Sequence, residues 1–200
     1  MVFLIGCDVS SLVIDTLCKE AEEGRAAVAC FYFDFADQEQ SPGAILASVL
    51  KQVVRGLGEI PEKIVKAFQG RERAIGGQML ALSKIVEFLQ DISSSLSTFI
   101  CIDALDECLP GHRMKLLDSL NQILQESPGA RIFMTGRPHI RDEVEKHLGG
   151  RAATISITPT KSDIITFLRA KLKEDIMPDA MDESLEQEII QKIPETVSEM

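Results

Sequence analysis

The sequence lacks several features that mark particular classes of protein. It has no tryptophan and only one tyrosine in 200 residues, and its longest unbroken apolar run, Ala26 to Phe33, is too short to span a membrane. Its first residues are apolar, but no basic segment precedes them and Asp8 interrupts them, so no secretory signal peptide is predicted. We therefore expect a cytoplasmic protein without a membrane partner.

Cysteine and histidine are few, and their spacing is uninformative. The five cysteines contain no C-x-x-C pair, and their odd number leaves one unpaired in any disulfide scheme. Most of them lie in apolar stretches, which favours reduced, buried thiols in a cytosolic protein. The three histidines, His112, His139 and His147, do not have the spacing of metal ligands. These patterns argue against a disulfide framework and a zinc site.

Basic residues are outnumbered, at 21 against 31 acidic residues, which gives a net charge of −10. This excess of acid argues against broad binding to nucleic acid or to an anionic membrane. The segment from Met181 to Met200 alone holds six acids and one lysine. Its apolar residues Leu185, Ile189 and Ile193 have helical spacing, so the charge run is interpreted as the solvated face of a small helix.

What the sequence does have is enough apolar residues, 45%, to predict a folded domain with its own core. Strand-like and helix-like patterns alternate along it, which predicts an α/β fold with a parallel sheet and helices on both sides. We expect strands at 2–5, 26–35, 98–103, 131–134 and 154–157. We expect helices at 10–23, 41–55, 62–68, 79–92, 112–126, 140–148 and 163–172, the last capped by Thr160 or Ser162, and a glycine-rich loop at 70–77.

Acidic residues follow the third predicted strand, where parallel sheets gather their ligands. Four apolar residues lead into Asp103, and Asp106 and Glu107 come shortly after it. A carboxylate at Asp103 can hold Mg²⁺, while Asp106 or Glu107 can orient or deprotonate a water that attacks a phosphate. The alternative is that Asp106 and Glu107 only begin a solvated turn.

The fourth predicted strand ends in a second polar group, Thr135 and Arg137. Both would stand at the same edge of the sheet as Asp103, because parallel strands end on the same side. Arg137 could then contact a terminal phosphate, whose oxygen geometry suits a guanidinium. The alternative is a surface arginine before a proline turn.

These segments resemble those of a known family. The string Ile102-Asp-Ala-Leu-Asp-Glu-Cys108 resembles the Walker B motif of NACHT-type (STAND) P-loop NTPases, among them nephrocystin-like and fungal NACHT proteins that often carry ankyrin or WD repeats. Thr135-Gly-Arg-Pro138 resembles their sensor 1. The segments Ala29 to Phe35 and Ile45 to Gln52 resemble their second strand and the helix after it.

The resemblance implies a P-loop NTPase-like three-layer sandwich with the strand order 5-1-4-3-2. It implies ATP or GTP with Mg²⁺ as cofactor, Asp103 as the metal ligand, Thr135 and Arg137 as further nucleotide contacts, and Asp106 and Glu107 as catalytic residues. Residues 1–158 would form the NACHT-like core, and 159–200 the start of a truncated helical lid region. The family role would be nucleotide-driven switching in signalling, through self-association or partner domains.

The phosphate-binding loop departs from this family. A P-loop needs G-x-x-x-x-G-K-[ST] after the first strand, but the stretch from Ile5 to Ser11 has no lysine, and the first lysine in the chain is Lys19. Asp8 also places a negative charge where phosphate would sit. Losing three charge-assisted hydrogen bonds costs roughly 4 to 9 kcal/mol. Micromolar nucleotide binding would weaken to about millimolar or worse.

Two origins and three functions fit this departure. The chain is either a truncated product, which its abrupt ends favour, or a degenerate domain that keeps the fold without turnover. The first functional hypothesis is a NACHT-like nucleotide-binding domain with weak or no hydrolysis. The second is a non-catalytic interaction module derived from an NTPase fold. The third is an unrelated α/β phosphohydrolase that uses Asp103, Asp106 and Glu107 to hold a metal.

Overall fold

The computed structural model describes most of the chain, which forms two compact units. The described residues are 2–5, 10–22, 26–34, 40–72, 80–157, 160–173 and 183–198. Most of the stretch where a P-loop is expected, residues 6–9, lies outside them. The larger unit is Met1–Ser156 and the smaller is Ile157–Met200. The two are described separately.

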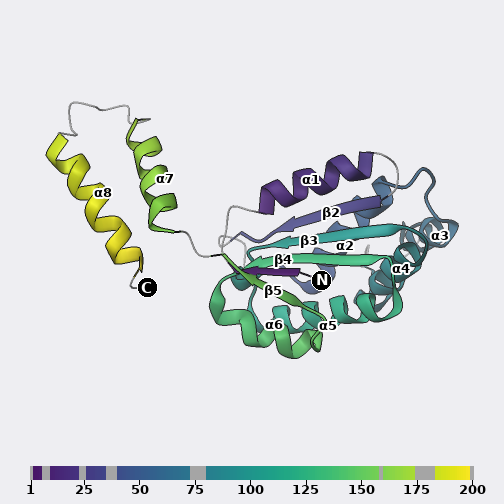
Figure 1. The fold of residues 1–200 in the computed structure, drawn as a ribbon. Helices are drawn as coiled ribbons and strands as arrows, with labels where there is room; N and C mark the ends of the chain where they lie inside the picture. The colour runs from purple at the N-terminus through teal and green to yellow at the C-terminus, as the bar shows by residue number, and fades with distance from the viewer. Residues whose placement is uncertain are drawn as a thin grey trace. The chain divides into compact units, whose positions relative to one another are not determined.

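The larger unit is built on a parallel sheet whose strand order matches the prediction. Its strands are β1 (Val2–Ile5), β2 (Ala26–Tyr32), β3 (Ser97–Asp103), β4 (Ala130–Gly136) and β5 (Ala153–Ser156). Every neighbouring pair is parallel, and the order is β2-β3-β4-β1-β5, as Figure 1 shows. Read from the other edge, this is the predicted order 5-1-4-3-2. The fold class is therefore confirmed.

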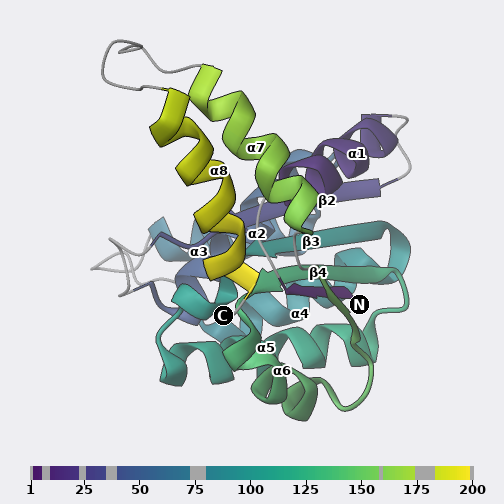
Figure 2. The same ribbon diagram turned by 60° about the vertical axis from the view of Figure 1, so that its left-hand side comes forward.

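Helices cover both faces of this sheet, and the strand order explains which helix takes which face. Helix α1 (Ser10–Glu22) packs on one face against β2 and β3. Helices α2 (Pro42–Arg55), α4 (Leu82–Ser95), α5 (Pro110–Glu126) and α6 (Arg141–Leu148) form the layer on the other face (Figures 1 and 2). The connection from β1 to β2 runs toward the β2 edge of the sheet, whereas the later connections between strands run toward the β5 edge. Because connections between parallel strands are right-handed, α1 lies on one face of the sheet and the helices of the later connections lie on the other.

The main hydrophobic core lies between the sheet and this helix layer. Phe3 of β1 and Phe88 of α4 are among its fully buried side chains. The apolar stripes predicted for α4 and α5 point into it, with Ile85, Leu89 and Leu116 inaccessible to solvent. The edge strand β2 is tied to α2 by the Gln52 amide, which both accepts from the Cys30 N–H (2.9 Å) and donates to the Cys30 carbonyl (2.8 Å).

Several predicted boundaries differ from the structure. Strand β2 ends at Tyr32 rather than Phe35, and α4 begins at Leu82 rather than Met79. Helix α3 (Glu62–Glu72) continues through residues 70–72, where glycine had predicted a loop, while 73–77 lies outside the described residues. The prediction of buried thiols holds for Cys101 and Cys108 but is wrong for Cys18, which is exposed on α1.

The smaller unit is a pair of helices, α7 (Lys161–Lys173) and α8 (Glu183–Ser198), that pack against each other. Thr160 caps α7, as one of the two predicted alternatives. Its hydroxyl accepts from the Asp163 N–H (3.2 Å), and the Asp163 carboxylate accepts from the Thr160 N–H (2.8 Å), which is a reciprocal capping arrangement. Within the described part of the chain, no helix is both long and apolar enough to cross a membrane.

Candidate functional site

The carboxyl ends of β3 and β4 bring Asp103 and Thr135 into contact. Asp103 is the last residue of β3, and Thr135 lies near the end of the adjacent strand β4. The buried Thr135 hydroxyl donates to Asp103 Oδ1 at 2.6 Å and accepts from the Ala104 N–H at 2.9 Å. Among the described residues, no hydrogen bond involves Asp103 Oδ2. One carboxylate oxygen of Asp103 is therefore fixed by the contact between the two strands.

Ala104 turns the chain sharply after β3. Its φ of 54° lies in the left-handed region, and it is the one such residue other than glycine in the described chain. This conformation costs an L-residue roughly 1 to 2 kcal/mol. The hydrogen bond from its N–H to Thr135 helps to hold it. The strained residue leads directly into a single 3₁₀ turn, Leu105–Glu107, which carries the two remaining acids.

Asp106 and Glu107 are held by Arg137, the residue after β4. The Arg137 backbone N–H donates to Asp106 Oδ1 at 3.1 Å, and its Nε lies 3.4 Å from Asp106 Oδ2. Its Nη2 lies 3.8 Å from Glu107 Oε1. The Asp106 side chain is only 7% exposed, whereas that of Arg137 is 72% exposed. Asp106 is thus not a solvated turn residue, and the arginine covers it from the solvent side.

Sequence reasoning missed a second arginine that organises the same turn. Arg113, on the first turns of α5, is buried and donates to the carbonyls of Cys108 (2.8 Å) and Asp106 (3.3 Å). Its Nε and Nη2 both donate to Glu143 Oε2 of α6, at 3.0 and 2.8 Å. A basic residue on an amphipathic helix carries no sequence signal for such a role. Arg113 connects the acid-bearing turn to α6.

A pocket of about 410 Å³ opens beside this turn. Its walls include Asp106, Glu107, Arg113, Arg137 and His139. Glu107 Oε2 is buried and has no hydrogen-bond partner among the described residues. A buried carboxylate oxygen of this kind is costly unless a ligand or water pairs with it.

A thiol also lines this pocket, but it is not a nucleophile. Burial raises the pKa of the Cys108 thiol to about 11, with the Arg113 cation opposing the shift. The thiol is therefore protonated at neutral pH, and a protonated thiol is a poor nucleophile. The other polar side chains that line the pocket are those of Asp106, Glu107, Arg113, Arg137 and His139.

The side chains of this site could hold a magnesium ion only if a bound ligand supplied further oxygen atoms. Among the described residues, no group of three or more His, Cys, Asp or Glu side chains is arranged to hold a metal ion. Mg²⁺ bound with a nucleotide commonly takes one or two carboxylates and completes its shell with phosphate and water. Asp103 fits that role. The sequence from Ile5 to Ser11 does not supply the lysine that would hold the phosphates.

The structure thus collects the predicted site residues into two contact groups at one edge of the sheet. Asp103 pairs with Thr135, and Asp106 and Glu107 pair with Arg137. The fold is that of a P-loop NTPase-like domain. Residues 9–137, which contain all five of these side chains, match the model of the family described as Nephrocystin 3, N-terminal. The chain belongs to that family.

Solved structures similar to this chain include three proteins of low sequence identity. The ORC1 protein of Aeropyrum pernix, solved in complex with DNA, is 18% identical over 86% of this chain and 43% of its own, with a TM-score of 0.51. The Drosophila ORC bound to AT-rich DNA and Cdc6 is 10% identical over 86% and 63%, with a TM-score of 0.49. A Walker-type ATPase of Pyrococcus abyssi is 15% identical over 98% and 60%, with a TM-score of 0.46.

These likenesses concern the fold alone. The chain spans less than two thirds of the length of each of these three structures. Among curated proteins, none matches the chain.

Proposed function

We propose that this chain is a NACHT-like nucleotide-binding domain for signalling or assembly, with weak or no nucleotide hydrolysis. The observation that carries the proposal is the Thr135–Asp103 hydrogen bond at the ends of β3 and β4. It orients one carboxylate oxygen and leaves the other for a metal ion. In this proposal, residues 1–158 are the nucleotide-binding core and 159–200 are the beginning of a lid. Its setting is the cytoplasm, and its partners are further copies or associated domains rather than nucleic acid.

The proposal gives each site residue a role. When MgATP or MgGTP binds, the metal supplies charge for the phosphates, and Asp103 holds it directly or through water. Thr135 keeps the Asp103 carboxylate in place. Asp106 or Glu107 accepts a proton from an attacking water. Arg137 contacts the terminal phosphate, but to do so its guanidinium must leave Asp106 and Glu107.

Two features support weak turnover. The stretch from Ile5 to Ser11 lacks the lysine that neutralises the β- and γ-phosphates in a P-loop. In addition, Arg137 forms ion pairs with both Asp106 and Glu107, the two acids that could accept a proton from the attacking water.

Binding is tested by titration calorimetry of the full chain with MgATP and with MgGTP. We expect dissociation constants of about a millimolar or weaker. Asp103→Ala is expected to abolish that binding, whereas the control Glu126→Ala, an exposed acid at the end of α5, leaves it unchanged. Nucleotide binding that is indifferent to Asp103→Ala would count against the proposed metal ligand.

Hydrolysis is tested separately by phosphate release. We expect no ATP or GTP turnover above the rate of a no-enzyme blank. Turnover by the unchanged chain would contradict the prediction that it does not hydrolyse nucleotides. If that turnover disappears in Asp103→Ala, the proposed role of Asp103 is still supported.

A non-catalytic interaction module is the second candidate, and the closed Asp106–Glu107–Arg137 cluster favours it. Arg137 already pairs with Asp106 and Glu107 across the ends of β3 and β4, so these contacts form without any ligand. This candidate predicts no nucleotide binding by calorimetry. Micromolar binding of MgATP would rule it out.

A further inference from the structure

Two cysteines stand side by side on the face of the sheet that α1 covers. Cys30 of β2 and Cys101 of β3 are register partners in a parallel pair. Their chain neighbours Ala29 and Ile100 belong to the core on the opposite face, and side chains alternate along a strand, so both thiols point toward α1. Cys101 is 1% exposed, whereas Cys30, on the edge strand, is half-buried. The pair is therefore open to solvent on the Cys30 side.

The spacing of the two strands decides what these thiols can form. Neighbouring strands lie about 4.8 Å apart, and the Cβ atoms of parallel partners keep roughly this separation because they leave the sheet in the same direction. A disulfide needs Cβ atoms about 3.8 Å apart, so it would require the strands to move. An ion between the two sulfurs replaces one sulfur–sulfur bond of about 2.0 Å by two metal–sulfur bonds of about 2.3 Å. The register thus suits a bridging ion better than a disulfide.

One of the two thiols is more ready to lose its proton than the other. The Cys101 thiol donates a hydrogen bond to the Cys30 sulfur, which lowers the pKa of Cys30 and raises the pKa of Cys101. Burial opposes the first shift and adds to the second. Metal ions bind the thiolate rather than the thiol. Cys30 is therefore the first ligand, and Cys101 gives up its proton when the ion binds.

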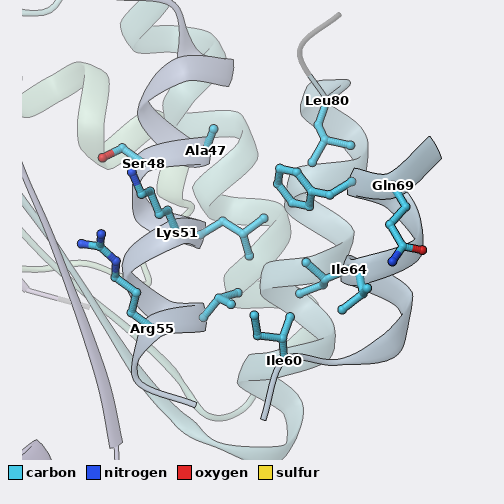
Figure 3. Close-up of a pocket in the computed structure, with 12 residues that line it drawn as sticks. Ala47, Ser48, Lys51, Arg55, Ile60, Ile64, Gln69 and Leu80 are labelled. Carbon is cyan, nitrogen blue, oxygen red and sulfur yellow. The ribbon is translucent and has the colours of Figure 1, made fainter. Parts of the chain in front are cut away.

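The type of ligand restricts the type of ion. The pair supplies two soft sulfurs, and among the described residues no third His, Cys, Asp or Glu side chain completes a metal-binding group with them. Structural zinc takes four protein ligands, whereas Cu(I) is selected by soft thiolates and accepts two of them. The pocket of about 870 Å³ between α2 and α3 lies on the other face of the sheet, and none of its described lining residues is a cysteine (Figure 3).

We propose that Cys30 and Cys101 bind one soft, thiophilic metal ion of the Cu(I) class between β2 and β3. Each cysteine contributes one thiolate sulfur, the two protons pass to solvent, and no electron is transferred. The bound ion fastens the edge strand β2 to β3. Nothing in this proposal depends on nucleotide binding, because neither thiol belongs to the site at the strand ends.

The test is a competition titration of the full, reduced chain without oxygen. Cu(I) is supplied as its complex with the coloured chelator bicinchoninate, and loss of colour reports transfer to the protein. We expect the chain to withdraw Cu(I), and to bind Zn²⁺ about a hundredfold more weakly or not at all. X-ray absorption at the copper edge should show sulfur neighbours alone. Failure to withdraw Cu(I), or equal affinity for Zn²⁺, overturns the proposal.

Substitutions of single cysteines identify the ligands. Cys30→Ala and Cys101→Ala are each expected to weaken Cu(I) binding about a hundredfold or more. The matched control Cys108→Ala also removes a buried thiol but should leave the affinity unchanged. Circular dichroism checks that each variant is folded, and the half-buried Cys30 keeps the test valid if Cys101→Ala unfolds. Cu(I) affinity that survives Cys30→Ala overturns the proposal.

A variant that retains only the pair gives the stoichiometry. Cys7→Ser/Cys18→Ser/Cys108→Ala is expected to bind one Cu(I) per chain, and its melting temperature should rise with Cu(I), since an ion that binds only the folded state stabilises it. Adding Cys30→Ala to this variant should abolish both effects. Loss of Cu(I) binding in the folded pair-only variant would show that another cysteine holds the ion, and would also overturn the proposal.

Discussion

At the scale of single residues, the sequence predicts which side chains meet at the ends of the strands, but it does not predict contacts that arise when helices pack together. Asp103, Thr135 and Arg137 could be predicted to lie together, because parallel strands end at one edge of the sheet. Arg113 could not, since its partner Glu143 comes thirty residues later. That contact exists only because α5 and α6 pack side by side. The contact between Arg137 and Asp106 could not be predicted from the sequence either, because it follows the left-handed turn at Ala104.

Arg113 is expected to be important for stability. Arg113→Met removes four hydrogen bonds and leaves Glu143, 24% exposed, without its cation. Breaking a buried pair in this way costs about 3 to 5 kcal/mol, and the partial exposure of Glu143 reduces this to about 2 to 4 kcal/mol. Urea denaturation followed by circular dichroism measures the change in unfolding free energy.

Two further variants isolate the cause of that loss. Arg113→Met/Glu143→Met should recover part of the stability, because no unpaired carboxylate remains. Arg141→Ala breaks an ion pair with Glu145 that is exposed, so it should have little effect. An equal loss in Arg113→Met and Arg141→Ala would contradict the structural role of the buried arginine.

At the scale of elements, the sequence pattern predicted every strand and α-helix of the described chain, but only some of their ends. Hydrophobic spacing reports which face is buried, whereas an end depends on local turns and on neighbours. Glycine at 70 predicted a loop, yet α3 continues through it, since one glycine costs a helix only about 1 kcal/mol. The 3₁₀ turn at Leu105–Glu107 has no periodic signal at all.

The junction between α4, α5 and β4 depends on Gly129. A Cβ at this position would stand 2.3 Å from the Ser93 carbonyl oxygen and 3.0 Å from that of Leu96, both at the end of α4. Since backbone atoms cannot move aside cheaply, Gly129→Ala is expected to destabilise the protein by about 1 to 3 kcal/mol. Thermal or urea unfolding measures the loss.

Gly111 provides the matched control for that substitution. A Cβ there meets nothing within 4 Å, and the residue lies in the first turn of α5. Gly111→Ala should therefore be neutral or stabilising by up to about 1 kcal/mol. The close approach at Gly129 would be refuted if the two alanine variants were equally stable.

At the scale of the whole molecule, the two units differ in how much they bury. The larger unit holds the sheet, the site and the hydrophobic core. The smaller unit has no buried residue in α7, where Phe167 is 61% exposed, and its acidic helix α8 exposes Leu185 and Ile193. The sequence predicted the helices of this unit from their spacing. It could not reveal how little they bury, since an amphipathic pattern does not say whether a partner covers its apolar face.

This difference predicts the pattern of amide hydrogen exchange. Elements with few buried apolar contacts open with free energies near zero, whereas core elements approach the free energy of global unfolding. The exchange protection of α7 is best compared with that of α6, because helix length and burial predict opposite results for this pair. It has 8 residues against 13, so helix length alone would make α6 the less stable of the two. However, Val144 and Leu148 of α6 are fully buried. Exchange followed by mass spectrometry should therefore show α6 better protected than α7, with β3 and β4 slowest. Stronger protection of α7 than of α6 would mean that a surface covers α7 in solution.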